Sequence, residues 1–176
     1  FTFSPTEEQI KLIETLSIFM TKKEDKGLFL LKGFAGTGKT SVVSALIKSM
    51  HELKMNFVLL APTGRSAKVL SSYAEQKAWT IHKKIYRKQD ASLSSPFSLA
   101  PNLHKDTLFI VDEASLISTY SYNNFFGSGD LLDDLIQYVY SAFNCHLLLI
   151  GDTAQLPPAM QEESVALDKG ELETYG

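Results

Sequence analysis

The pattern of apolar and polar positions changes period several times along the chain, and it predicts alternating helices and strands. Helical spacing marks residues 5–20, 42–50, 64–76 and 131–143, whereas continuous apolar runs occupy residues 28–31, 56–61, 107–111 and 146–150. Apolar runs without alternation are typical of strands that are buried on both faces. Strands that alternate with helices predict an α/β fold, in which helices flank both faces of a parallel sheet.

Two sets of residues could start the first helix. Ser4 is a good capping residue, Pro5 suits the first helical position, and Glu7 follows the cap by three residues. Thr6 and Gln9 have the spacing of a capping box as well. Because the first set already provides a start, we predict that the helix begins at Pro5.

Two stretches interrupt the alternation of helices and strands. Residues 89–102 (QDASLSSPFSLAPN) are rich in Ser, Ala and Pro and predict a surface loop or hairpin. Residues 119–129 (TYSYNNFFGSG) form a second irregular insertion. Neither stretch marks a domain boundary, and a length of 176 residues suits one domain. We therefore expect residues 1–176 to form a single domain.

The overall composition is that of an ordinary globular protein, with 44% hydrophobic and 21% charged residues. No apolar run approaches the roughly 18 residues of a membrane span, and no signal peptide opens the chain. Cys145 is the only cysteine, so an internal disulfide is excluded. These features predict a cytoplasmic protein without a membrane partner.

Charge is distributed unevenly, although the formal net charge is only −3. Residues 77–88 (KAWTIHKKIYRK) hold five lysines and arginines and no acidic residue. Such a run is most often a solvated face, and it becomes a nucleic-acid candidate only if its neighbours support that interpretation.

The sequence GFAGTGKT at residues 33–40 lies between a predicted strand and a predicted helix. Its glycines allow positive φ angles and a close approach of the backbone to a phosphate, which the helix N-terminus also favours. The lysine can reach the β- and γ-phosphates of a nucleotide, and the threonine hydroxyl can bind Mg²⁺. The loop residues that we expect to contact the nucleotide are Gly33, Gly36, Thr37, Gly38, Lys39 and Thr40.

Two adjacent carboxylates, Asp112 and Glu113, end the apolar run at 107–111. Charged groups at the end of a buried strand are costly unless they bind something. Asp112 can bind Mg²⁺ through water, and Glu113 can deprotonate a water that attacks the γ-phosphate. Because a kinase would not need this second carboxylate, the pair favours hydrolysis.

A third polar segment, GDTAQLPP at residues 151–158, follows the apolar run at 146–150. The carboxyl ends of parallel strands meet at one edge of a sheet, where ligands bind. At that edge Gln155 can donate a hydrogen bond to the γ-phosphate and report its presence. A turn ended by proline is the alternative interpretation of the segment.

Five motifs occur in order: GFAGTGKT at 33–40, APTGRSA at 61–67, TIHK at 80–83, VDEAS at 111–115 and GDTAQLPP at 151–158. Together they resemble the first RecA-like motor lobe of superfamily 1B DNA helicases, and most closely the RecD-type group, named after the alpha subunit of exonuclease V. The last two motifs are far more specific than the glycine loop, which many unrelated ATPases share. The resemblance spans residues 9–158 and departs from the family pattern at 159–162.

The resemblance implies roles at the nucleotide residue by residue. Lys39 and Thr40 correspond to the phosphate and Mg²⁺ ligands. Asp112 and Glu113 correspond to the metal-binding and catalytic carboxylates, and Gln155 to the γ-phosphate sensor. For Gln9 two interpretations stay open: the resemblance implies a hydrogen bond to adenine, whereas its spacing from Thr6 predicts a capping partner. We favour the contact with adenine.

Two further motifs correspond to the family's contacts with single-stranded DNA. The first contact comprises Pro62, Thr63, Gly64 and Arg65, and the second comprises Thr80, His82 and Lys83. This resemblance changes the interpretation of the basic run at 77–88, because its cations could neutralise phosphates without reading the base sequence.

The resemblance implies an ATP-driven motor on single-stranded DNA that uses Mg²⁺ and works with a second RecA-like lobe. The second lobe would follow in the same full-length chain and supply an arginine finger. We therefore expect residues 1–176 to be part of a longer helicase, and the isolated lobe to be a weak or inactive ATP hydrolase. Repair or recombination subunits are further partners of this family. The alternatives are a P-loop ATPase that acts as a nucleotide-dependent switch or loader, and a binding module with a vestigial nucleotide site.

Overall fold

The computed structural model describes residues 5–21, 26–88, 97–118, 126–152, 154 and 164–175. Five parallel strands form its central sheet in the order β1-β7-β6-β2-β3. The strands are β1 (Gly27–Lys32), β2 (Asn56–Ala61), β3 (Ala78–Thr80), β6 (Thr107–Val111) and β7 (Cys145–Gly151). Every residue of β6 and β7 is buried, because both strands have neighbours on each side and helices on each face.

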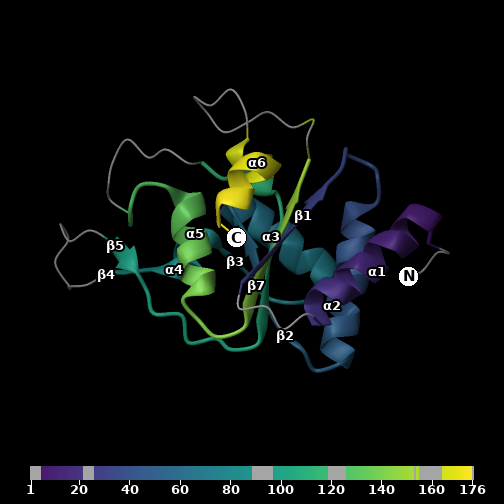
Figure 1. Cartoon of the computed structure of the whole chain (residues 1–176), viewed down its shortest axis with the longest axis horizontal. Coiled ribbons are helices and arrows are strands. Elements are labelled where there is room, and N and C mark those ends of the chain that lie inside the picture. Colours follow the sequence, from purple (N-terminus) through teal and green to yellow (C-terminus); the bar gives the residue numbers. More distant parts are fainter. Residues whose placement is uncertain are drawn as a thin grey trace.

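Helices cover both faces of the sheet (Figure 1). One face carries α1 (Glu7–Thr21), α2 (Lys39–Glu52) and α3 (Gly64–Ala74). The other carries α4 (Ile81–Ile85), α5 (Leu131–Tyr140), α6 (Lys169–Leu172) and the short 3₁₀ turns η1 (Ala114–Leu116), η2 (Val165–Leu167) and η3 (Glu173–Tyr175).

Each face of the sheet has its own hydrophobic core, because successive residues of a strand point to opposite faces. In β7, Leu148 belongs to the core beneath α1, α2 and α3. Its neighbours Leu147 and Leu149 belong to the core beneath α4 and α5. This arrangement confirms the predicted α/β fold with a parallel sheet between helix layers.

The first helix begins at Glu7, so the prediction of a start at Pro5 is wrong. A capping box explains the later start: the Thr6 N–H donates to Gln9 Oε1 at 3.0 Å, and the Gln9 N–H donates to Thr6 Oγ1 at 3.3 Å. Ser4 lies outside the described residues.

Other boundaries differ from the predictions by local effects. Helix α3 ends at Ala74, before the predicted residue 76, because Glu75 adopts the left-handed conformation with φ 53°. Helix α5 ends at Tyr140 instead of residue 143. The sequence did not predict β3 and α4, which are three and five residues long. Elements this short span little more than one period of an amphipathic pattern, so the sequence shows no repeat that would reveal them.

The predicted loop or hairpin at 89–102 is confirmed as a hairpin in its described part. Strand β4 (Tyr86–Lys88) pairs antiparallel with β5 (Phe97–Leu99), and residues 89–96 lie outside the described ranges. Asp134 of α5 holds this region, since its buried Oδ2 accepts bonds from the Tyr86 hydroxyl at 2.6 Å and the Ser128 N–H at 3.0 Å. Residues 119–125 of the second insertion are not described.

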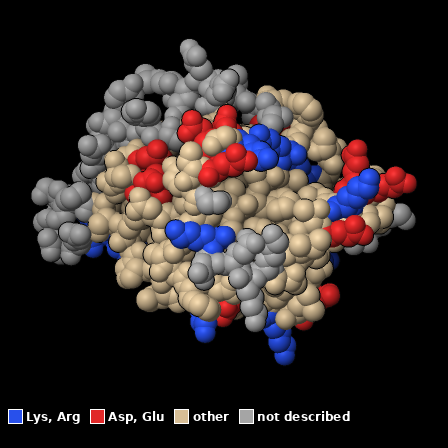
Figure 2. All heavy atoms as spheres, viewed as in Figure 1, with Lys and Arg blue, Asp and Glu red and all other residues tan. Residues whose placement is uncertain are grey.

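None of the described helices combines the length and the apolar character that a membrane span requires. Figure 2 shows acidic side chains gathered over α5 and α6 on the face in view. The cytoplasmic location stays a prediction.

Candidate functional site

The carboxyl edge of the sheet brings three of the predicted motifs together. Strand β1 leads into the glycine loop, β6 into the two carboxylates, and β7 into the polar segment that begins at Gly151. The ends of β1 and β7 are joined by the Gly33 N–H, which donates to the Gly151 oxygen at 3.2 Å. A cavity of about 370 Å³ opens between them, lined by Ala35, Gly36, Gly38, Lys39, Thr40, Asp112, Glu113, Gly151 and Asp152.

The glycine loop has the backbone that a phosphate cradle requires. Gly36 and Gly38 adopt φ angles of 79° and 86°, a region that side chains disfavour. Gly38 also precedes the first residue of α2, and no side chain caps this helix start. The loop is closed by Thr37, whose hydroxyl donates to the Phe34 oxygen at 2.8 Å. Anions are favoured at such an uncapped helix N-terminus, so the cavity suits a phosphate.

Lys39 supplies the positive charge of the cavity. Its Nζ donates to the oxygens of Gly33 and Phe34 and lies 3.7 Å from Asp152 Oδ2. Asp152 is only 6% exposed, and its Oδ1 accepts the Ala154 N–H at 2.9 Å. The sequence pattern predicted no contact between Asp152 and the lysine, although the position of Asp152 directly after β7 places it at the same edge of the sheet. Together these contacts hold the lysine side chain across the loop.

Asp112 is held by one hydrogen bond at each carboxylate oxygen. Its Oδ1 accepts the Glu113 N–H at 2.9 Å, and its Oδ2 accepts the Tyr73 hydroxyl at 2.7 Å. Burial, followed by the charge of Asp112, raises the pKa of Tyr73 well above its ordinary value, so the phenol remains a donor. Tyr73 escaped the sequence analysis because nothing in the local pattern at the end of α3 connects it with β6.

Glu113 adopts a left-handed backbone conformation at the end of β6. Its φ of 58° and ψ of 36° lie in the left-handed region, where a residue with a side chain is strained by about 1–3 kcal/mol. This conformation turns the chain sharply from β6 into η1, and Glu113 lines the cavity beside Asp112. Lys54, Glu75, Asp106 and Asn144 adopt the same conformation at turns, so the position of Glu113 in the lining of the cavity, and not its backbone, fits the predicted catalytic role.

The donor set of the cavity fits Mg²⁺ in one particular way. Among the described residues, no group of three or more His, Cys, Asp or Glu could hold a metal ion by itself. Mg²⁺ is commonly bound by one or two protein ligands, with waters and substrate phosphates completing the coordination. Thr40 and Asp112 line the cavity together and could serve as those protein ligands.

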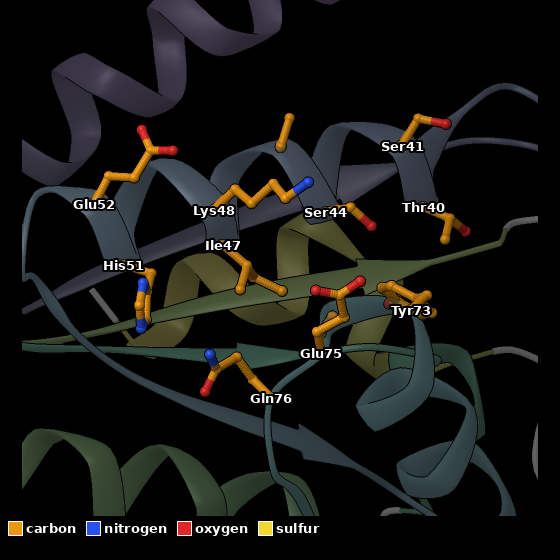
Figure 3. Close-up of a pocket in the computed structure, with 12 residues that line it drawn as sticks. Thr40, Ser41, Ser44, Ile47, Lys48, His51, Glu52, Tyr73, Glu75 and Gln76 are labelled. Atoms are coloured by element: carbon orange, nitrogen blue, oxygen red, sulfur yellow. The ribbon is translucent and has the colours of Figure 1, made fainter. Parts of the chain in front are cut away.

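A larger hollow of about 590 Å³ lies between α2 and the end of α3 (Figure 3). Thr40, Ser44 and His51 line it from α2, and Tyr73 and Glu75 line it from the opposite side. The glycine loop before Thr40 and both strand-end carboxylates lie outside its lining. We therefore assign the phosphate site to the smaller cavity, where the loop, the lysine and the carboxylates converge.

Gln9 and Gln155 are the two remaining residues that the sequence predicts to contact the nucleotide. Gln9 forms the capping box with Thr6, as the alternative interpretation predicted. Its amide also lies against the glycine loop, since a Cβ added to Gly38 would lie 2.7 Å from Gln9 Nε2. The contact with adenine stays a prediction. Gln155 lies outside the described residues.

The two segments predicted to contact DNA emerge side by side. Ala61, the last residue of β2, pairs with Thr80 of β3, so residues 62–65 and 80–83 follow neighbouring parallel strands. Thr63 caps α3 by accepting the Ser66 N–H at 3.1 Å. Thr80 caps α4 in the same way, accepting the Lys83 N–H at 3.2 Å. Both hydroxyls therefore orient the helix that follows them.

Aromatic rings and cations surround a hollow next to the second segment. The hollow measures about 460 Å³ and is lined by Thr80, His82, Lys83, Tyr86, Arg87, Lys88, Phe97 and Phe126. The rings of Phe97 and Phe126 stack with their centroids 4.7 Å apart, and Lys88 Nζ lies 5.5 Å above the Phe97 ring. Burial lowers the pKa of His82, so at pH 7 its imidazole is mostly neutral and contributes no full charge.

Comparisons with known proteins agree with this geometry. A family model described as an AAA domain matches residues 6–167. An uncharacterized protein of Acanthamoeba polyphaga mimivirus, R530, is 30% identical over 184 residues, which cover 91% of this chain and 34% of that protein. The ATP-dependent RecD2 DNA helicase of Deinococcus radiodurans is 28% identical over 155 residues, which cover 87% of this chain and 18% of the helicase.

A comparison with solved structures finds the same fold. The Pif1 helicase from Candida albicans matches with a TM-score of 0.60 and 17% identity, over 97% of this chain and 38% of that chain. The chain spans about a third of the length of the mimivirus protein and about a fifth of the length of the RecD2 helicase. At this level the matches support a helicase-like P-loop domain.

The cavity geometry predicts that Lys39→Ala abolishes nucleotide binding while the protein stays folded. The ammonium group is the cation that lines the cavity, and its removal opens no apolar void. The matched control is Lys48→Ala, which removes an exposed lysine of the same helix. Calorimetric titration with ATP and circular dichroism check both variants. Unchanged ATP affinity in Lys39→Ala would contradict the assignment.

Proposed function

The chain belongs to the AAA domain family, and from this premise we propose that it is the ATP-binding motor lobe of a RecD-type DNA helicase or translocase. Mg-ATP binds at the carboxyl edge of the sheet, and its hydrolysis drives movement on single-stranded DNA. One observation carries the proposal: Lys39, Asp112 and Glu113 line one cavity, and both candidate DNA segments follow strands that end at the same sheet edge.

The glycine loop and Lys39 bind the phosphates of ATP. Backbone N–H groups at the uncapped start of α2 donate hydrogen bonds to the phosphate oxygens, and Lys39 turns from the loop oxygens to the β- and γ-phosphates. Asp152 remains beside the lysine and keeps its ammonium at the floor of the cavity. Gln9, whose amide lies against Gly38, contacts the adenine.

Hydrolysis depends on the two strand-end carboxylates. When bound, Mg²⁺ neutralises charge on the β- and γ-phosphates. Thr40 would hold Mg²⁺ through its hydroxyl, and Asp112 would hold it through water; both residues line the cavity. Glu113, which lines the cavity beside Asp112, takes a proton from the attacking water. Gln155 completes the site as the sensor of the γ-phosphate.

Single-stranded DNA lies across the neighbouring strand ends. Pro62, Thr63, Gly64 and Arg65 form the first contact, and Thr80, His82 and Lys83 form the second. Thr63, Gly64, Arg65 and Lys83 are exposed, so their polar groups are accessible to phosphates. Lys83 and Lys88 are exposed and line the adjacent hollow, which supplies further cations for phosphates.

The proposal includes a second RecA-like lobe. The chain has two arginines, Arg65 and Arg87, and neither lines the nucleotide cavity. Arg87 Nη1 donates to the oxygens of Lys83 and Tyr86, which directs it toward its own chain. An arginine that stabilises the transition state contributes about 10³–10⁵ in rate, and the second lobe supplies it. Repair or recombination subunits are further partners under this proposal.

The two carboxylates should respond differently to removal of their charge. Glu113→Gln should retain Mg-ATP binding and lose hydrolysis by at least about 10²-fold, because the amide keeps the shape but cannot accept the proton. Asp112→Asn should weaken the Mg²⁺-dependent part of ATP binding. ATP titrations of this chain with and without Mg²⁺ separate the binding roles, and single-turnover hydrolysis is measured in the full-length protein, because the second lobe supplies the arginine. Equal loss of ATP binding in both variants would contradict the assignment.

The DNA interface predicts a shallower salt dependence when two cations are removed. Replacing Arg65 and Lys83 with Gln should reduce the slope of log affinity against log salt by about 1.4, since each phosphate contact to a single strand contributes about 0.7. The control replaces Lys54 and Lys105 with Gln, because these lysines precede β2 and β6 at the opposite sheet edge. Oligothymidylate binding by fluorescence anisotropy gives the slopes, and equal slopes in both double variants would refute this interface.

A further inference from the structure

Tyr73, near the end of α3, forms a hydrogen bond with the carboxylate of Asp112, which directly follows β6. The two residues are 39 positions apart in the sequence, and their side chains form a direct hydrogen bond of 2.7 Å. The other oxygen of Asp112 accepts the Glu113 N–H at 2.9 Å. The carboxylate is therefore held from two directions by donors that belong to different elements.

Tyr73 lies at the boundary between the two hollows beside α2. Its side chain lines the larger hollow together with Thr40 (Figure 3). Thr40 also lines the smaller cavity, together with Asp112. The body of the tyrosine packs against the apolar core between α2, α3 and the sheet, which fixes the ring. The phenol thus contacts Asp112, which lines the nucleotide cavity, although Tyr73 itself is not part of that lining.

We propose that Tyr73 is a positioning residue for Mg²⁺ binding, acting through Asp112. The proposal rests on the function proposed above, in which Asp112 and Thr40 bind the metal with the nucleotide. A carboxylate that is already fixed does not have to lose rotational freedom when the metal arrives. Mutation of a residue that hydrogen-bonds to a metal ligand commonly lowers metal affinity by 10- to 100-fold. Loss of the Tyr73 hydroxyl should therefore lower the affinity for the metal and leave metal-free nucleotide binding unchanged.

The test compares Tyr73→Phe with the wild-type chain. This change removes only the hydroxyl, so the ring should keep its place in the core. Mn²⁺ binding to the protein–ADP complex is measured by electron paramagnetic resonance, and ADP binding in EDTA is measured by calorimetry. We expect Mn²⁺ affinity to fall about 10-fold in Tyr73→Phe, the lower end of the range for such partners, with ADP affinity in EDTA unchanged.

Tyr140→Phe is the matched control, because the Tyr140 hydroxyl is buried without a hydrogen-bond partner among the described residues. It should leave both affinities at their wild-type values. Wild-type Mn²⁺ affinity in Tyr73→Phe would overturn the positioning role, as would an equal loss of ADP affinity in EDTA, which indicates a general structural effect. Failure of the wild-type chain to bind ADP with Mn²⁺ would instead overturn the proposed function.

Discussion

All five strands of the central sheet run in the same direction, and the rest of the structure depends on this constraint. In parallel pairing, β1, β6 and β7 must end at one edge, so the glycine loop, the two carboxylates and Asp152 meet there although they are far apart in the sequence. The same pairing places the ends of β2 and β3 beside them. The segments predicted to contact the nucleotide and the nucleic acid thus lie at one edge of the sheet.

The polar groups of this edge are already ordered by one another. Lys39 is held by loop oxygens and by Asp152, and Asp112 is held by Tyr73 and the Glu113 backbone. Each hydrogen bond satisfies a charge that would be costly to leave unpaired at a partly buried position. A site built in this way loses little conformational freedom on binding, which favours affinity and correct geometry.

Helix α3 lies between the two parts of the edge. It begins directly after Thr63, in the first candidate DNA segment, and its penultimate residue, Tyr73, bonds to Asp112. The helix therefore joins the first candidate DNA segment to the carboxylate of Asp112.

The sequence predicted those features that depend on local pattern or on strand direction. Four apolar runs became the strands β1, β2, β6 and β7, and their direction alone placed Lys39, Asp112 and Glu113 in one cavity. Contacts between distant side chains could not be predicted, because no local period encodes the bond from Tyr73 to Asp112. The start of α1 was missed for a related reason: two capping patterns overlapped, and only the fold decided between them.

The central claim is that the smaller cavity at the strand ends, and not the larger hollow between α2 and α3, binds the metal–nucleotide complex. Paramagnetic broadening of backbone amide signals by Mn²⁺-ADP tests this directly. The account predicts selective broadening at residues 33–40, 112–113 and 151–152, with unaffected signals at Lys54 and Lys105 on the opposite edge. Broadening centred on His51 and Glu75, which line the larger hollow, would contradict it.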